Sequence, residues 1–215
     1  MMRIAFALPL AATLLTLGVA TGFAQTQQQV RLRGSIDEVA GDKLTYVIRD
    51  GATINVLMTP DTRITAVSGT TLSDIKPGSY VGTAAVPDKD GMLRALEVHI
   101  FNEAQRGVGE GHRPFDLAPE STMTNATVGM DVAPTAQVAQ STAENDARRI
   151  LTLNYPGGQQ KVIVPDDAPI VRLEPGARDL IAAGAKANVT GYKAPDGSVT
   201  ATSISIGTNG LTPPM

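Results

Sequence analysis

The chain repeats an order of landmark residues at a constant spacing of 106 residues, and this spacing limits the folds that it can adopt. Residues 44–100 and 150–206 align without a gap, and ten of these 57 positions are identical. Most of the identical residues are turn formers or apolar residues of alternating segments, which set backbone geometry. The spacing predicts two similar β-units. The identical pairs are Gly51/Gly157, Val56/Val162, Asp61/Asp167, Ile64/Ile170, Ile75/Ile181, Gly78/Gly184, Asp90/Asp196, Gly91/Gly197, Ala95/Ala201 and Ile100/Ile206.

Alternating apolar and polar residues predict five strands in each unit. Asp50-Gly51 and Asp90-Gly91 predict tight hairpin turns, because the residues of such turns must accept positive φ. The predicted elements of the first unit are strands at 30–39, 44–48, 54–58, 79–86 and 96–100, with one helical turn at 72–75. Those of the second unit are strands at 127–138, 150–153, 161–164, 185–192 and 198–206, with a helix at 176–183.

Three strands, a helix and two more strands form the element order of an OB-type barrel. We therefore predict an all-β fold with a minor helix, built from two tandem OB-like five-stranded β-barrel units that are related by an internal repeat. A single larger β-sandwich built from both halves is the alternative.

Residues 1–24 are typical of a secretory signal peptide. Arg3 is the only charge, an apolar run spans 4–20, and Gly22 and Ala24 place small residues before a cleavage site. Cleavage would make Gln25 the first residue, whereas the alternative is an uncleaved anchor helix. We predict a periplasmic protein with no membrane span after signal cleavage. The predicted divisions are a signal peptide at 1–24, a first OB-like unit at 25–101, a loop or linker at 102–124, a second OB-like unit at 125–207 and a mobile tail at 208–215.

Four strings of the first unit combine turn residues with apolar strand residues. They are Gly34-Ser35-Ile36 with Asp42-Lys43-Leu44-Thr45, then Pro60-Asp61-Thr62-Arg63-Ile64, then Leu72-Ser73-Asp74-Ile75-Lys76-Pro77-Gly78, then Asp90-Gly91 with Ala95-Leu96-Glu97-Val98. Together they resemble a bacterial exported β-domain family that is catalogued only as a domain of unknown function. The resemblance implies an OB-like barrel. Because these strings are fold motifs, it implies no catalytic residues.

Composition disfavours several classes of function. The chain has no cysteine, which excludes disulfides, thiolate metal sites and cysteine nucleophiles. Without residues 1–24 it has 17 basic and 21 acidic residues and no basic stripe, which disfavours nucleic-acid binding. No serine lies in a Gly-x-Ser-x-Gly string, and no other catalytic grouping stands out. We predict that the protein is not an enzyme and needs no cofactor.

The stretch between the units holds the strongest candidates for a binding site. It has no hydrophobic period and several glycines, which is typical either of a linker or of a functional loop. Glu110, His112, Arg113 and Asp116 offer hydrogen-bond acceptors, donors and a titratable ring within a short span. We predict that these four residues form a binding loop.

A metal site is the second candidate. Glu97 and His99 lie two residues apart on a strand, and we expect both to share its outward face. If the loop folds back, His112 could complete an imidazole–carboxylate site for a divalent metal. The sequence thus predicts an exported non-catalytic binding or interaction protein for an unknown envelope protein or small ligand. The alternative is a metal-binding accessory protein that is linked to metal transport or homeostasis.

Overall fold

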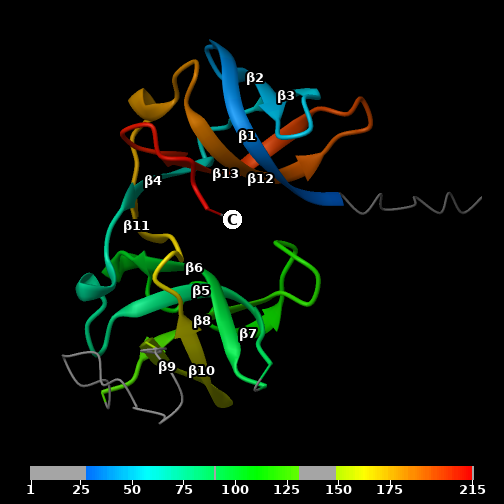
Figure 1. The fold of residues 1–215 in the computed structure, drawn as a ribbon. Coiled ribbons are helices and arrows are strands. Elements are labelled where there is room, and N and C mark those ends of the chain that lie inside the picture. The colour runs from blue at the N-terminus through cyan, green and yellow to red at the C-terminus, as the bar shows by residue number, and fades with distance from the viewer. Residues whose placement is uncertain (1–27, 90, 131–148, 215) are drawn as a thin grey trace, which may run out of the picture.

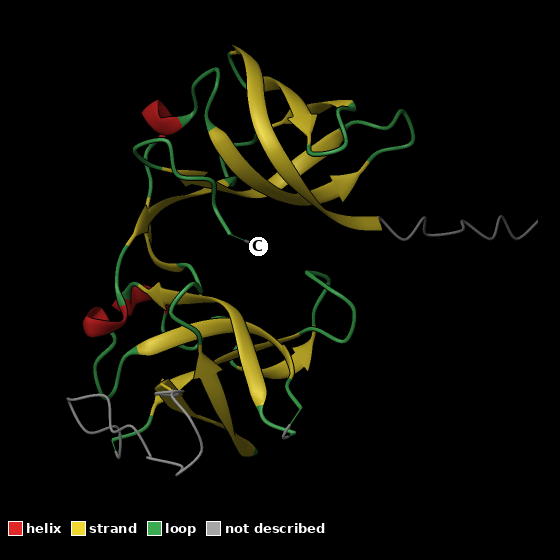
Figure 2. Ribbon diagram, in the orientation of Figure 1, coloured by secondary structure: helices red, strands yellow, loops and turns green. Residues whose placement is uncertain are grey.

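The computed structural model describes residues 28–89, 91–130 and 149–214, and more than half of these residues form β-strands. Figure 2 shows strands throughout the molecule and only short helical turns between them. The predicted all-β class is therefore confirmed. The predicted signal peptide at 1–24 and most of the predicted strand at 127–138 lie outside the described residues. Within the described residues, no helix has the length and apolarity to cross a membrane.

Most of the predicted strands are present, but the strands at 63–69, 111–114 and 170–175 were not predicted. The strand at 122–128 overlaps the predicted one at 127–138 by only two residues. The strands are β1 (Gln28–Ala40), β2 (Lys43–Ile48), β3 (Thr53–Leu57), β4 (Arg63–Gly69), β5 (Tyr80–Pro87), β6 (Leu93–Phe101), β7 (Gly111–Pro114), β8 (Thr122–Val128), β9 (Arg149–Tyr155), β10 (Gly158–Val164), β11 (Ile170–Pro175), β12 (Lys186–Lys193) and β13 (Val199–Gly207). The 3₁₀ turns are η1 (Leu72–Asp74), η2 (Glu103–Gln105) and η3 (Arg178–Leu180).

Two lobes lie one above the other in Figure 1. In the upper lobe, hydrogen bonds join β13, β12, β1, β2 and β3 in that order, and a parallel pairing of β3 with β13 closes the circuit. In the lower lobe, β10, β9, β8, β5 and β6 form the corresponding circuit, which a parallel pairing of β10 with β6 closes. The short strand β7 adds to β8.

Neither lobe is built from one contiguous half of the chain. The upper lobe combines the first three strands with the last two, whereas β5 and β6 pair with β8 in the lower lobe. The predicted tandem barrels, each made from one sequence unit, are therefore not what the structure shows: the strands form one 13-stranded mixed sheet. The cause lies in β4 and β11, which pair with each other and carry the chain from one lobe to the other (Figure 1).

The two circuits have matching registers. The parallel contact Val199↔Val56 closes the upper circuit, and Leu93↔Val162 closes the lower one, with each residue 106 positions from its counterpart. The bulge between Thr190 and Gly191 likewise has its counterpart between Ala84 and Ala85. At the crossing, Val67 pairs with Leu173, so two counterpart positions face each other between β4 and β11.

Turn conformations follow the same spacing. Gly51 and Gly157 both have φ +92°, Gly78 and Gly184 have φ +82° and +81°, and Gly91 and Gly197 have φ +72° and +85°. Only glycine adopts this left-handed region readily. The glycines of the aligned sequence thus occupy turns of the same kind.

Each lobe has its own apolar core. The upper core gathers buried side chains of all five strands, among them Tyr46, Val189 and Ile204. The lower core includes Val81, Val98 and Leu153. A third cluster at the crossing consists of Val67, Val171 and Leu173, against which Phe101 and Leu211 pack. Burial of apolar surface therefore stabilises each lobe and also the crossing between them.

One local prediction is wrong. The predicted helix at 176–183 is only the 3₁₀ turn η3, because Ile181 enters the upper core and Gly184 N donates to Ile36 O at 2.7 Å. In the tail at 208–215, which we predicted to be mobile, Leu211 contacts the crossing cluster and Pro213 is buried. The Asn188 amide also donates to Pro214 O at 3.1 Å.

Candidate binding cleft between the lobes

A cleft of about 200 Å³ lies between the lobes, and strands of both line it. The upper lobe contributes residues of β1, β12 and β13, and the lower lobe contributes residues of β6, β7 and β8 together with one loop residue and Leu173 of β11. Because the two halves of the chain are exchanged, each wall contains strands that are far apart in sequence. The lining residues are Arg31, Leu32, Arg33, His99, Phe101, Arg113, Phe115, Met123, Asn125, Leu173, Asn188, Val189, Thr190 and Ser205.

The lower wall is set by the register of β5, β6 and β8. Gly82 pairs with His99 on one side and with Asn125 on the other, so these side chains share one face of the sheet. A Cβ atom at Gly82 would lie 2.8 Å from Asn125 Oδ1 and 2.9 Å from the Phe101 ring. The absence of a side chain at Gly82 therefore allows Asn125 and Phe101 to approach each other.

Buried polar groups lie at this wall. Glu97 and His99 are each 1% exposed, and Asn125 is 5% exposed. His99 Nε2 lies 3.0 Å from Glu97 Oε1, yet neither atom has an aligned hydrogen-bond partner among the described residues. Asn125 Nδ2 donates to Val108 O at 3.0 Å, whereas Asn125 Oδ1 also has no such partner there. Buried polar atoms without partners are costly, and their presence beside a cleft marks a place where a ligand could supply hydrogen bonds.

The upper wall presents two arginines of β1. Arg31 pairs with Thr190 and Arg33 with Asn188, so all four side chains face the cleft on one side of the sheet. Arg33 Nη2 lies 3.0 Å from Asp116 Oδ1, and Arg31 Nη1 lies 3.5 Å from the same oxygen.

These contacts join the two lobes. Asp116 follows β7 of the lower lobe, whereas both arginines belong to the upper lobe. The Arg31 guanidinium also lies 5.2 Å from the centre of the Phe115 ring. We call the contacts of Phe115 and Asp116 with Arg31 and Arg33 the clasp. Partial burial opposes ionisation of Asp116, but the hydrogen bond from Arg33 and the charges of both arginines outweigh it and lower the pKa of Asp116.

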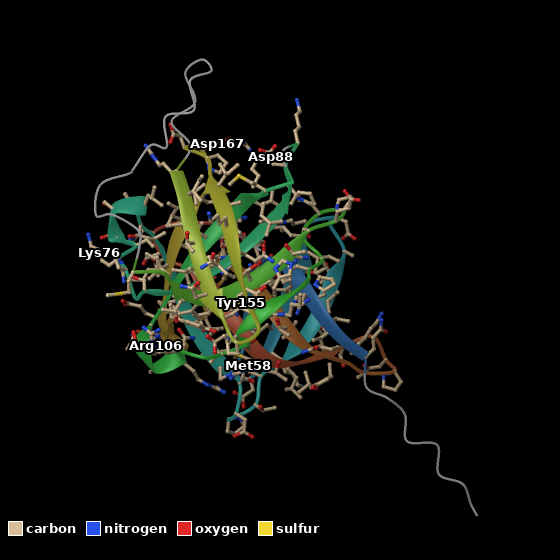
Figure 3. All side chains as sticks on the ribbon, turned by 90° about the horizontal axis from the view of Figure 1, so that it is seen from below. Met58, Lys76, Asp88, Arg106, Tyr155 and Asp167 are labelled. Atoms are coloured by element: carbon tan, nitrogen blue, oxygen red, sulfur yellow. The ribbon has the colours of Figure 1, made fainter. Side chains whose placement is uncertain are left out.

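The segment 102–124 is not a linker loop. Asn102 caps η2, and β7 pairs in register with β8 from Gly111↔Asn125 to Pro114↔Thr122. Arg106, labelled at the edge of the molecule in Figure 3, donates to Gly78 O at 2.9 Å. Tyr80 donates from its hydroxyl to Val108 O at 3.1 Å, and burial together with the Glu110 carboxylate raises the pKa of Tyr80. The segment is thus an added piece of the lower lobe.

The predicted binding-loop residues do not form one cluster. Arg113 lines the cleft and donates to Gly109 O at 2.5 Å, and Asp116 belongs to the clasp. Glu110 is exposed. His112 Nδ1 lies 2.8 Å from Thr124 Oγ1, and its ring stacks on Tyr155 at 6.4 Å between centres. Tyr155 is labelled on the lower lobe in Figure 3.

The three predicted metal ligands are also separated. Glu97 and His99 meet, but they are buried rather than on an outward face. His112 pairs with Thr124, which pairs with Thr83, and this row projects from the face opposite to that of His99. The described residues contain no group of three or more His, Asp or Glu side chains that could hold a metal ion.

The sequence reasoning missed the residues of the upper wall. Arg31 and Arg33 alternate with apolar residues along β1, which is typical of a half-buried strand. This pattern could not show that a second lobe lies opposite the two arginines. No sequence pattern indicated a role for Asn125 or Gly82, because their role depends on a strand pairing between distant segments.

Comparison with known proteins covers part of this architecture. Residues 33–99 match DUF5666, a domain of unknown function. The predicted resemblance to a domain of unknown function is confirmed over these residues. No curated protein and no solved structure shows significant similarity to the chain. The matched residues run from β1 to β6, so they begin in the upper lobe and end in the lower lobe.

Proposed function

We propose that this protein is exported to the periplasm and acts there as a non-catalytic binding protein, with the cleft between the lobes as its binding site. The observation that carries this proposal is the cleft wall in which Asn125 Oδ1 is buried without a hydrogen-bond partner among the described residues, close to the buried His99 ring. Ligand sites typically combine apolar walls with a few placed polar groups. Phe101, Phe115 and Val189 supply the apolar part of this lining.

The size of the cleft favours a small molecule. Its volume of about 200 Å³ lies below the range of roughly 300–1,000 Å³ that is common for drug-sized ligands. A protein chain or a nucleic acid would need a far larger contact surface. We therefore propose a small ligand rather than a macromolecular partner for this site.

The test is retention of a small molecule by the mature protein. We expect components of a periplasmic small-molecule extract to raise the melting temperature and to shift the amide resonances of Asn125 and Thr190. Ser205→Phe should fill the cleft and abolish both effects. Thr45→Phe is the matched control, because Thr45 is also half-buried on an upper-lobe strand but does not line the cleft. Equal responses of both variants, or no response of the wild type, would overturn the proposal.

Export has its own test. Signal cleavage after Ala24 predicts Gln25 as the first residue of the periplasmic protein, which mass spectrometry can measure. Full-length chain in the membrane pellet would instead support the anchor-helix alternative.

A metal-binding accessory role remains the alternative proposal. Its support is the buried contact of Glu97 with His99, since imidazole and carboxylate are ligands for divalent metals. Calorimetric titration with zinc and with copper tests it. If a metal binds to this pair, His99→Gln should abolish metal binding. His112→Ala should leave metal binding intact, because His112 projects from the other face of the sheet.

For the fold, we propose an internal duplication of an OB-like unit whose last two strands are exchanged between the copies. Support comes from the matching circuits, bulges and turn glycines, and from the counterpart pair Val67↔Leu173 at the crossing. Such a chain resembles a domain-swapped dimer joined into one polypeptide.

A further inference from the structure

We propose that the cleft binds a small molecule with an oxyanion group, a carboxylate or a phosphate, which pairs with Arg33 and Arg31 in exchange for the Asp116 carboxylate. This inference rests on the proposed function, because it names the ligand class of the same cleft.

The charge of the lining is the first argument. Three arginines line the cleft, namely Arg31, Arg33 and Arg113, and no acidic side chain among the described residues lines it. The chain as a whole carries a net charge of −3, so this local excess of positive charge is not a consequence of composition. Guanidinium groups bind carboxylates and phosphates through paired, charge-assisted hydrogen bonds.

The clasp shows how such a group would sit. One carboxylate oxygen of Asp116 already lies within reach of both Arg33 and Arg31, at 3.0 and 3.5 Å. The Asp116 side chain is 50% exposed, whereas the Arg33 side chain is only 19% exposed. The Arg33 guanidinium is thus mostly enclosed in the wall, whereas the carboxylate that meets it is half exposed. Partly exposed ion pairs contribute little to stability, so a ligand oxyanion can replace Asp116 at low cost.

The remaining polar groups restrict the rest of the ligand. Asn125 Oδ1 can only accept a hydrogen bond, so the ligand needs a donor on that side. Arg113 uses one of its donors on Gly109 O and keeps others for the ligand. The rings of Phe101 and Phe115 line the same cleft. The site therefore fits a small acid with an apolar part and a hydrogen-bond donor.

The experiment is a calorimetric titration of the mature chain at low salt with succinate and with inorganic phosphate, using sodium chloride of equal ionic strength as the blank. We expect Asp116→Asn to tighten the binding of one anion by about fivefold, which corresponds to about 1 kcal/mol. Arg33→Gln should weaken the binding of the same anion by at least about tenfold. The anion whose affinity changes in these variants shows whether the oxyanion is a carboxylate or a phosphate.

Asp42→Asn and Arg178→Gln are the matched controls. Asp42 and Arg178 form an exposed ion pair in the upper lobe, and neither residue lines the cleft. Both controls should bind like the wild type, and circular dichroism should show that every variant is folded. Should Arg33→Gln unfold, Arg31→Gln replaces it, since Arg33 still holds Asp116 in that variant.

Two negative results are distinguishable. If neither anion binds more strongly than chloride, even in Asp116→Asn, the oxyanion assignment is wrong. If the periplasmic extract still shifts the Asn125 resonance in that case, the cleft remains a binding site for another class of molecule. If the extract also has no effect on the Asn125 resonance, the proposed function is wrong as well.

Discussion

Arg33 in the upper lobe and Asn125 in the lower lobe occupy corresponding places. Arg33 pairs with residue 188 of β12, and Asn125 pairs with residue 82 of β5, 106 positions earlier. The same correspondence relates Arg31 to Met123, and Ser205 to His99. The two lobes therefore share a backbone plan but present different chemistry to the cleft.

The difference lies almost entirely on the cleft faces. Both lobes place arginine and amide groups at the cleft, but only the upper lobe adds hydroxyl groups and only the lower lobe adds an imidazole, that of His99. Clusters of buried apolar side chains form the cores of both lobes, and the lower lobe also buries Thr83 and Thr124. Packing limits which residues a core accepts, but a face that borders a cleft is limited only by what it contacts. This contrast is why the cleft, rather than either core, is the best candidate for function.

The largest effect is expected from separating the two sequence units. A fragment of residues 25–101 holds β1–β3 without β12 and β13, and β5 and β6 without β8. It should therefore not form a folded monomer, and two copies should instead exchange β5 and β6 into a dimer. Analytical ultracentrifugation measures this state. A stable folded monomer of this fragment would show that the exchange of strands is not essential.

Truncation of one core residue in each lobe should give the next largest effect. Leu153 in the lower lobe and Ile204 in the upper lobe are fully buried. Leu153→Ala and Ile204→Ala should each lower the free energy of unfolding by about 2–5 kcal/mol. Because each lobe contains strands of both sequence units, both variants should shift one common transition in urea. Two separate transitions would mean that the lobes unfold independently.

A smaller effect tests where the lobes differ in packing. Gly34 pairs with Ala187, and its counterpart Ala126 pairs with Val81. A Cβ atom at Gly34 would lie 2.0 Å from Val47 O, so Gly34→Ala should lower the free energy of unfolding by about 1–3 kcal/mol. Gly69→Ala is the control, because nothing lies within 4 Å of its Cβ position, and it should change stability by less than about 0.5 kcal/mol. Equal losses in urea denaturation would contradict this steric account.

The smallest effect concerns the clasp and its dependence on pH. The pKa of Asp116 is lower in the folded protein than its ordinary value near 3.9, so its stabilising contribution is present above that pH and is lost as the pH falls through the folded-state pKa. A double-mutant cycle of Asp116→Asn with Arg33→Gln should give a coupling of up to about 1 kcal/mol at pH 7. The coupling should decrease as the pH falls through the folded-state pKa of Asp116. A coupling that persists in acid would show that it is not electrostatic.

The local structure of this protein could be predicted well. Apolar alternation predicted most of the strands but missed β4 and β11. The glycines at 51, 78, 91, 157, 184 and 197 all adopt the positive φ of their turns. The prediction of a helix at 176–183 was wrong because the helix propensity of these residues stabilises a helix less than burial of Ile181 stabilises the observed turn. The prediction of a loop or linker at 102–124 missed β7, because a strand of four residues has too short a pattern to detect.

The candidate site could be predicted only in part. Arg113 and Asp116 were singled out in the sequence and lie at the cleft, and Glu97 and His99 were expected to meet. The grouping of His112 with His99 failed because the register of β7, β8, β5 and β6 sends the two rings to opposite faces. A shift of one residue in any of these pairings would reverse that outcome.

By itself, the sequence determined most of the strands, which glycines form turns and which side chains share a face, since each of these depends on a few neighbouring residues. Only the tertiary structure decided which strands pair. Backbone hydrogen bonds between strands do not depend on their order in the chain, so β12 and β13 can complete either lobe without a change in local pattern. That choice placed Arg31 and Arg33 opposite His99 and Asn125, and it thereby created the cleft.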